Sequence, residues 1–423
     1  MIKRATAAIS LLIALSRVVA GSPGETVSFS GSVKSFFSLY TFSQRSAAWF
    51  GLGPQTLASL NNRLRFKLGA SPAEFLDFEI AYELGPKVQA PDLFNLDPLG
   101  TSPSPGEYRA TDFRTWLYPA HSEPTGSFGL AQDLDRFSFT LKFPAADLTV
   151  GRQVVAWGGA RIINPTDVIL PFSFNELDKE ERTGVDAVRL RIPLGTLSEL
   201  DTGVVLGRGF SLKDGAAFLR GRFSLAGTDA ALLLLGFKRH LLIGVDLART
   251  VGGASLWLEG AYVKAGAFQL EPDPSDRDYF RLSCGADHGL GKNSYVFVEY
   301  HFNSAGGRAA SDYAGQTTTA AYRDGAVYLL GRHYLGAGLN TQLTPLLPVT
   351  GLVLWNVGDG SLTAFIQGEY NVAENIYLAA GFQIGGGRRP EVPVDPLPLP
   401  GLGIRSEFGL YPDLFFAAFR IYF

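Results

Sequence analysis

Segments of about ten to twelve residues in which apolar and polar side chains alternate recur along the whole chain. Successive side chains of a β-strand point to opposite faces, so this period of two predicts strands with one apolar and one polar face. Residues 73–84 show the pattern most clearly, with Leu76, Phe78, Ile80, Tyr82 and Leu84 on one face and Asp77, Glu79, Ala81 and Glu83 on the other.

The pattern predicts about 18 strands (16–18), and residues 108–119 could form one more. The candidate strands lie near 26–40, 58–69, 73–84, 133–143, 146–157, 183–193, 198–208, 215–226, 229–239, 241–251, 253–264, 278–288, 292–302, 325–339, 345–357, 361–371, 374–386 and 412–423. Short turns join alternate pairs of these strands, whereas the connections 85–132, 158–182, 303–324 and 387–411 are long. Short turns at one end and long loops at the other are typical of outer-membrane barrels.

The strand lengths favour a membrane barrel over a soluble β-sandwich. Strands of a sandwich usually have about five or six residues, whereas a tilted membrane crossing needs about 9–11. A closed barrel also satisfies every backbone N–H and C=O group inside lipid, which an open sheet cannot do. We therefore predict an all-β fold, a transmembrane antiparallel up-and-down β-barrel with long extracellular loops and an inward-folding loop, in one domain over residues 21–423.

The first hairpin offers a prediction of register. A short turn at 69–72 joins the first two clearly alternating segments. Counting back from its centre places Arg65 near Asp77 and Arg63 near Glu79 on the polar face, where opposite charges help to set the register.

The two chain ends carry targeting patterns. Residues 1–20 combine the basic Lys3 and Arg4, a short apolar stretch and a small-residue cleavage site, which predicts a signal peptide; the alternative is a buried N-terminal helix. The last strand alternates hydrophobic residues and ends in Phe419, Ile421 and Phe423, which resembles the signal read by the bacterial barrel-assembly machinery. Both patterns predict a bacterial outer-membrane location, reached through the inner membrane.

Composition excludes several classes of function. With 37 Lys and Arg against 40 Asp and Glu, the net charge of −3 does not favour nucleic acid as a partner. One Cys and five scattered His have no metal-binding spacing, so we predict no metal and no cofactor. Ser283, His288 and His301 lie on neighbouring predicted strands, but chance placement explains this grouping and we predict no enzyme.

Residues 151–192 are the densest charged and turn-rich stretch of the chain. They contain Gly151-Arg152-Gln153, Trp157-Gly158, Asn164-Pro165-Thr166-Asp167 and Glu180-Glu181-Arg182, followed by Gly184 and Asp186. This pattern resembles segments of bacterial outer-membrane porin-like barrels, including the alginate-export type. The resemblance covers about forty residues and implies that the strand runs into a loop, 158–182, which folds toward the lumen.

The residues of this loop agree with packing against the barrel. Its six large hydrophobic residues are too apolar for a loop that moves freely in water: Ile162, Ile163, Val168, Leu170, Phe172 and Phe174. The loop could narrow the lumen or pack over the rim, and both remain open. Asp167 is expected to cap the stretch after it, and Asp178 is expected to pair with Arg182 at helical spacing.

The polar faces of the strands carry charges of both signs. The predicted lumen contains Arg63, Arg65, Lys67, Arg136, Lys142, Arg220, Arg222, Arg281 and Arg420, with Asp77, Glu79, Glu83, Asp246, Glu259, Asp287, Glu299 and Glu369. These counts nearly balance, so no strong ion selectivity follows. Our candidates for lining or constricting a channel are Arg63, Arg65, Asp77, Glu79, Arg136, Arg152, Arg161, Asn164, Asp167, Glu180, Glu181 and Arg182.

The sequence therefore favours a porin-like channel for passive diffusion of small hydrophilic solutes. One alternative is a dedicated exporter of a polymer or a lipid-like substrate. Another is a non-conducting structural or adhesive barrel, whose long loops 85–132 and 387–411 would bind surfaces; the second of these is rich in Pro and Gly and contains the run Pro390–Pro400. Expected partners are outer-membrane lipid, the barrel-assembly machinery, a small solute and a second copy of the chain in a homo-oligomer.

Overall fold

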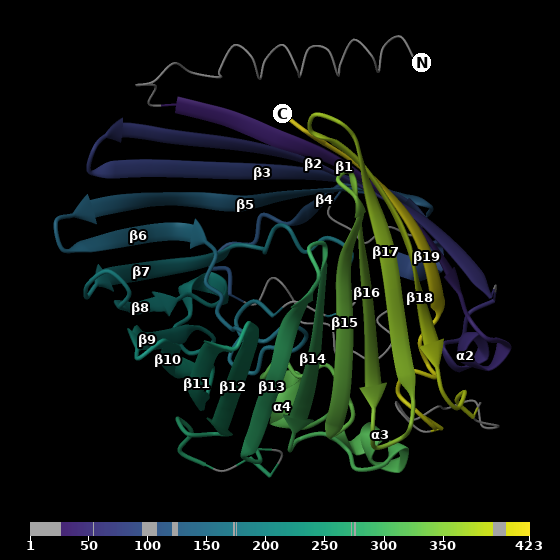
Figure 1. Cartoon of the computed structure of the whole chain (residues 1–423). Coiled ribbons are helices and arrows are strands. Elements are labelled where there is room, and N and C mark those ends of the chain that lie inside the picture. Colours follow the sequence, from purple (N-terminus) through teal and green to yellow (C-terminus); the bar gives the residue numbers. More distant parts are fainter. Residues whose placement is uncertain are drawn as a thin grey trace, which may run out of the picture.

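The chain closes on itself as one β-barrel. The computed structural model describes residues 27–423 except 54, 95–107, 121–125, 172, 173, 175, 272, 275 and 392–402; the signal-peptide prediction lies outside this part. Each strand runs antiparallel to its neighbours, and β1 (Val27–Thr41) pairs with both β2 (Thr56–Ala73) and the last strand, β19 (Asp413–Tyr422). The ring of 18 strands (Figure 1) confirms the predicted all-β barrel and its strand count.

The other strands follow one another around the ring in chain order. They are β3 (Leu76–Gln89), β5 (Phe128–Phe143), β6 (Ala146–Gln153), β7 (Val185–Pro193), β8 (Glu199–Val205), β9 (Ala216–Leu225), β10 (Thr228–Phe237), β11 (His240–Val251), β12 (Ala254–Lys264), β13 (Tyr279–Leu290), β14 (Ser294–Asn303), β15 (His333–Thr344), β16 (Leu347–Asn356), β17 (Leu362–Ala373) and β18 (Ile376–Gly386).

The helices are short and lie in the long connections (Figure 1). They are α2 (Gln44–Trp49), α3 (Tyr313–Gln316), α4 (Ala320–Arg323) and the 3₁₀ turns η1 (Pro91–Phe94), η2 (Arg208–Phe210) and η3 (Ala310–Asp312). Within the described residues, no helix has the length and hydrophobicity to cross a membrane. We call the end of the barrel that carries α3 and α4 the loop end, and the opposite end the turn end.

One short strand stands outside the ring of 18. β6 stops at Gln153, so the part of β5 nearest the loop end has no β6 partner on that edge. There β4 (Thr115–Tyr118) pairs with β5 between Leu130 and Gln132. The possible extra strand at 108–119 is therefore real but short. The predicted loop 85–132 is shorter than expected, because β3 continues to Gln89 and β5 begins at Phe128.

Two predicted strands were wrong at one end. The segment 146–157 leaves the wall after Gln153 and turns into the barrel, which alternation within the segment could not show. The segment 325–339 becomes a strand only at His333, because the residues before it belong to the loop that holds α4, where the Gly325 N–H donates to the Ala321 carbonyl at 3.0 Å.

The register predicted for the first hairpin was also wrong. Ser71 and Pro72 remain in β2, with an irregularity between Ala70 and Ala73, and the chain reverses only after Ala73. Proline has no N–H to donate, and in a sheet it is tolerated at such irregular positions. As a result Arg65 lies opposite Glu83, and Glu79 lies opposite Gly69.

The outer face of the barrel is apolar over many neighbouring strands. Leu335, Val353, Ile366 and Phe382 point outward and are 42–55% exposed in the isolated chain. A continuous apolar surface of this kind requires lipid or detergent around it.

The interior has a different composition. The inward positions carry most of the polar and charged side chains of the strands. Toward the loop end, segments that fold inward form an apolar cluster of their own inside the ring, which includes Val155, Leu170, Tyr322, Leu330 and Leu410. The barrel therefore encloses a packed group of loops and not only a water-filled space.

We predict that two neighbouring positions on β17 lose very different amounts of stability when a charge is introduced. Ile366→Arg places a cation on the lipid side and should destabilise the barrel by about 2–4 kcal/mol, the cost typical of arginine near the middle of a bilayer. Gln367→Arg points into the barrel and serves as the control, with a much smaller loss. Denaturant unfolding in lipid vesicles measures both, and equal losses would contradict the assignment of the two faces.

Candidate functional site: an inward strap and the charged wall

We call residues 158–182 the strap, and its described residues cross the interior of the barrel. One end of the strap binds inward-facing side chains of β12, β13 and β14, and the other end binds those of β1, β2 and β19. These two groups of strands lie on different sides of the ring.

Two buried glutamates hold the first end of the strap. Glu259 on β12 accepts hydrogen bonds from the backbone N–H groups of Gly159 (2.9 Å), Ala160 (3.0 Å) and Thr166 (2.8 Å), and from the Thr166 hydroxyl (2.7 Å). The exposed fraction of Glu259 is 0%. A buried carboxylate is costly unless hydrogen bonds satisfy it, so this contact stabilises both the strap and the wall.

Glu299 on β14 repeats the arrangement one step further along the strap. Its carboxylate accepts from the backbone N–H groups of Arg161 (2.6 Å), Ile162 (3.2 Å) and Ile163 (3.0 Å), and from the indole N–H of Trp257 (3.0 Å). Six backbone N–H groups of residues 159–166 thus point at two carboxylates of the wall, which sets the path of this part of the strap.

β13 and β12 add side-chain contacts to this end. Arg281 donates to the Asn164 carbonyl at 2.9 Å, and the Ser283 hydroxyl donates to the Ile163 carbonyl at 2.6 Å. The Arg161 guanidinium lies over the Trp257 ring and pairs with Asp287 at 3.1 Å, yet it remains 46% exposed. Arg161 is therefore a strap cation that is both positioned and accessible.

The second end of the strap is held by ion pairs. Asp178 accepts from Lys34 of β1 at 3.0 Å and from Arg63 of β2 at 2.6 Å. Glu180 accepts from Lys34 at 2.7 Å and contacts Arg420 of β19. Burial would raise the pKa of Glu180, but hydrogen bonds from Lys34 and from Tyr422 outweigh it and lower the pKa.

The strap is also tied to itself. Asp167 caps the following turn through the Leu170 N–H at 3.3 Å, which confirms the predicted cap, and it pairs with Arg182. The expected helical pair between Asp178 and Arg182 is wrong, because residues 176–182 are not helical and the wall supplies the partners of Asp178. Burial raises the pKa of Asp167 to about 7, against the opposing effect of the Arg182 guanidinium.

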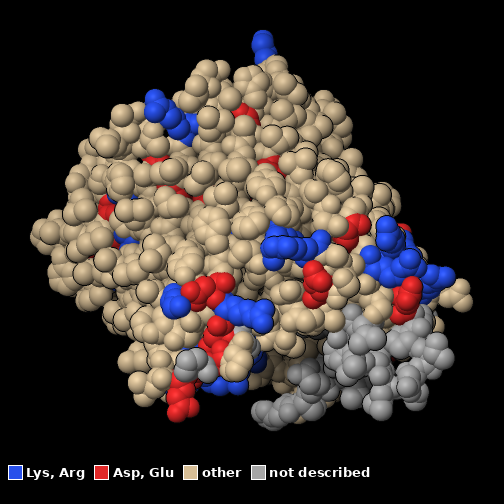
Figure 2. All heavy atoms as spheres, turned by 90° about the horizontal axis from the view of Figure 1, so that it is seen from below, with Lys and Arg blue, Asp and Glu red and all other residues tan. Residues whose placement is uncertain are grey.

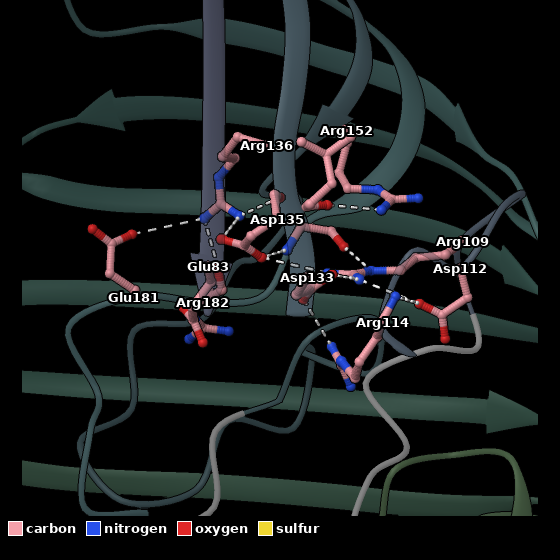
Figure 3. A network of polar contacts seen from close by, with 12 residues as sticks. Glu83, Arg109, Asp112, Arg114, Asp133, Asp135, Arg136, Arg152, Glu181 and Arg182 are labelled. Atoms are coloured by element: carbon pink, nitrogen blue, oxygen red, sulfur yellow. Dashed lines mark hydrogen bonds and ion pairs between the residues drawn. The ribbon is translucent and has the colours of Figure 1, made fainter. Parts of the chain in front are cut away.

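Next to the strap, a network of charged side chains fills the junction of β2, β3 and β5 (Figure 3). Asp135 forms an ion pair with Arg65 (2.6 Å), accepts a hydrogen bond from Arg136 (2.6 Å) and contacts Arg109 (3.4 Å). Arg136 also donates to the Arg182 carbonyl at 2.5 Å, and Arg65 lies 3.5 Å from Glu181. The network joins the wall to the last residues of the strap.

A second part of this network lies beside the edge of β5 that has no β6 partner. Arg109 is fully buried and binds Asp133 at 2.5 Å and the Gly184 carbonyl at 2.9 Å (Figure 3). Arg152 forms a two-pronged pair with Asp186, at 2.8 and 2.9 Å, and also donates to the Thr111 carbonyl. These contacts hold residues 109–111 where β6 would otherwise continue.

The structure brings most of the predicted site residues together. Arg63, Arg65 and Arg136 of the wall contact the strap, and Arg161, Asn164, Asp167, Glu180, Glu181 and Arg182 belong to it. Asp77 and Glu79 lie apart from it, paired with Lys142 at 2.6 Å and with Lys67 at 3.1 Å. Arg152 is 3% exposed and belongs to the wall network.

Sequence reasoning missed several residues of the site. Lys34, Arg109, Asp135 and Asp178 carry main contacts but were not candidates. Lys34 was detectable as the one cation on the polar face of the first strand. Arg109 had no such signal, because it lies in a connection whose path depends on residues elsewhere in the chain.

A buried carboxylate also ties the last long loop to the wall. Glu407 is 0% exposed and accepts from Leu330 N–H (2.9 Å) and Asn356 (2.8 Å), with the Tyr334 hydroxyl beside it. Burial raises the pKa of Glu407 to about 7. Most of the predicted Pro390–Pro400 run lies outside the described residues, so this contact involves the part of the loop that follows it.

The serine and histidine noted in the sequence do meet. The Ser283 hydroxyl lies 2.8 Å from His301 Nδ1, but both are buried and the same hydroxyl bonds the strap. Among the described residues, no three His, Cys, Asp or Glu side chains are grouped as metal ligands. Among the described residues at the loop end, positive and negative side chains lie in mixed groups (Figure 2).

The fold is similar to that of solved outer-membrane channels. Acinetobacter baumannii OccAB4 has a TM-score of 0.58 at 10% sequence identity, with 94% of this chain and 98% of that chain covered. A BenF-like porin from Pseudomonas fluorescens has a TM-score of 0.57 at 10% identity, covering 94% and 98%. Pseudomonas aeruginosa OpdK has a TM-score of 0.56 at 9% identity, covering 95% and 100%.

At these identities the likeness establishes the fold, an 18-strand barrel of the porin type. Comparison of the sequence with protein-family models and with curated proteins finds no match.

We predict that Glu259→Gln loosens the first end of the strap. One carboxylate oxygen becomes an amide nitrogen that cannot accept, which leaves buried N–H groups unsatisfied. Hydrogen exchange at Gly159, Ala160 and Thr166 should become about tenfold faster or more. Glu79→Gln removes a wall carboxylate that has no strap contact, so it should leave the exchange rates of these amides unchanged. Exchange in Glu259→Gln that is as slow as in the native chain would contradict the role of Glu259 in holding the strap.

We predict that Asp167 makes barrel stability depend on pH between about 4 and 7. Its pKa is higher in the folded chain, so its stabilising contribution is complete below the unfolded pKa and is lost as pH rises through about 7. The drop in melting temperature from pH 5 to pH 8 should be smaller in Asp167→Asn. Glu407 contributes in the same direction in both proteins, so the difference between them isolates Asp167.

Proposed function

We propose that the chain forms a porin-like channel in the bacterial outer membrane, through which small hydrophilic solutes diffuse passively. The observation that carries the proposal is the closed ring of 18 strands with an apolar outer face and a charged inner wall. Barrels of 16–18 strands are wide enough for an aqueous channel.

Similar proteins support the proposal. The solved structures that share the fold include a BenF-like porin and OpdK, and one structure of OpdK was determined with vanillate. In our proposal, this chain likewise admits small molecules and not polymers. The solute itself would be selected by the width of the passage and by the charges that line it.

We assign the constriction to the strap. Several of its charged side chains remain accessible, namely Arg161 (46%), Glu180 (39%) and Glu181 (38%), together with Glu176 and Lys179. These are the residues that would meet a passing solute. Arg152 and Asp167 are buried, so they would act by holding the strap and the neighbouring wall in place.

A gated exporter is the second candidate, and the packing of the interior favours it. Val168 and Leu170 of the strap belong to one apolar cluster with Tyr322, Leu330 and Leu410 of other inward segments. Such a cluster resists rearrangement, so a passage through it would open only when the strap moves.

Assembly would follow the usual route for outer-membrane barrels. The last residue, Phe423, exchanges both backbone hydrogen bonds with Gly31 of β1, at 2.8 and 3.0 Å, and so completes the closing pair of strands. Phe419, Ile421 and Phe423 share the outer face of that strand in our proposal and form the signal for the barrel-assembly machinery.

Planar-bilayer recording of the purified chain tests these proposals. The channel predicts open steps of steady size, and these steps should change in size or selectivity in Arg161→Ala, Arg152→Ala and Asp167→Ala because each alters the strap. Lys67→Ala, which removes a wall cation without a strap contact, is the control.

The remaining outcomes distinguish the candidates. Silence that deletion of residues 160–180 relieves would support the gated exporter. Silence in both proteins would support a structural barrel. Steady steps that none of the strap variants changes would keep the channel but remove the strap as its constriction.

A further inference from the structure

Three cations lie side by side across the strands that close the barrel. Lys34 of β1 is directly opposite Arg420 in the β1–β19 ladder, and directly opposite Arg63 in the β1–β2 ladder. All three side chains point into the barrel, and Lys34 is only 3% exposed. Like charges directly opposite each other destabilise a strand pair, and a charge as buried as that of Lys34 is screened less than one at the surface.

This row is placed where the ring has to close. In every other neighbouring pair of the ring, the two strands follow each other in the chain and are joined by a turn or a loop. β1 and β19, in contrast, are the first and the last strand of the ring. The β1–β19 ladder must therefore form without a short connection, and the charge repulsion acts on that ladder.

The strap supplies negative charges to this row of cations, with one carboxylate between each two neighbouring cations. Asp178 lies between Arg63 (2.6 Å) and Lys34 (3.0 Å), and Glu180 lies between Lys34 (2.7 Å) and Arg420. The wall adds Glu83 beside Arg63 and Glu369 beside Arg420, at the outer ends of the row. The ion pairs of Lys34, the central cation, are with the strap.

We propose that the strap is an electrostatic staple across the closing seam: Asp178 and Glu180 neutralise the row Arg63–Lys34–Arg420, so that docking of the strap and closure of β1 against β19 stabilise each other. The strap then has a role in holding the barrel shut that is separate from any effect on solute passage.

A change of sign tests whether the strap carboxylates neutralise the row. In the native chain, Lys34→Met removes the partner of two strap carboxylates and should lower the melting temperature. In the Asp178→Asn, Glu180→Gln background the strap no longer neutralises the row, so Lys34→Met removes a repelling charge and should raise the melting temperature by a few degrees. The measurement is the temperature at which the full-length barrel in detergent loses its β-sheet circular dichroism.

Lys67→Met is the matched control, because Lys67 lies on β2 but pairs with the wall residue Glu79 and not with the strap. Its effect should be the same in both backgrounds. If Lys34→Met lowers the melting temperature equally in both backgrounds, the staple is overturned. If the Asp178→Asn, Glu180→Gln protein does not fold, Lys34→Met must restore folding, and continued failure overturns the proposal as well.

Hydrogen exchange locates the effect. Loss of the charges of Asp178 and Glu180 should speed exchange of the β1 amides that bond β19, at Val33, Ser35 and Phe37. The acceleration should be several-fold larger than in the β9–β10 ladder, which the strap does not staple. Equal acceleration in the two ladders would show a general loss of stability and would contradict a seam-specific role.

Discussion

A strand that crosses a membrane must pair along both edges, because lipid offers no partner to a free N–H or C=O group. Here that requirement is met by closing 18 antiparallel strands into a ring. Alternation then sends apolar side chains outward and places most of the polar and charged side chains of the strands on the inner face. Any segment that fills the interior has to match a charged wall, and this governs how the strap is built.

The strap meets the wall in two chemically different ways. At one end its own backbone N–H groups satisfy Glu259 and Glu299, which would otherwise be buried and unpaired. At the other end its carboxylates Asp178 and Glu180 meet cations of the strands that close the ring. Wall and strap therefore depend on each other, since neither is electrostatically satisfied alone.

A single departure from the regular barrel accounts for the position of the site. When the chain leaves β6 at Gln153 to become the strap, it exposes the edge of β5 toward the loop end. Residues 109–111 and β4 fill that edge, and the buried Arg109 and Arg152 hold them there. The network in Figure 3 is thus the consequence of turning one strand into an inward loop.

The sequence by itself determined where most strands lie and which face each one presents, because alternation is a local property that neighbouring residues reveal. It did not show that 146–157 leaves the wall after Gln153 or that 325–339 becomes a strand only at His333. It also identified 158–182 as a segment too apolar to be free, and the cap at Asp167. Only the tertiary structure decided the partners. Asp178 pairs with Lys34 across the barrel and not with Arg182 nearby, and Arg65 faces Glu83, because pairing depends on ring closure and on where a hairpin turns. These contacts join distant parts of the chain, so the spacing of residues within one segment cannot predict them.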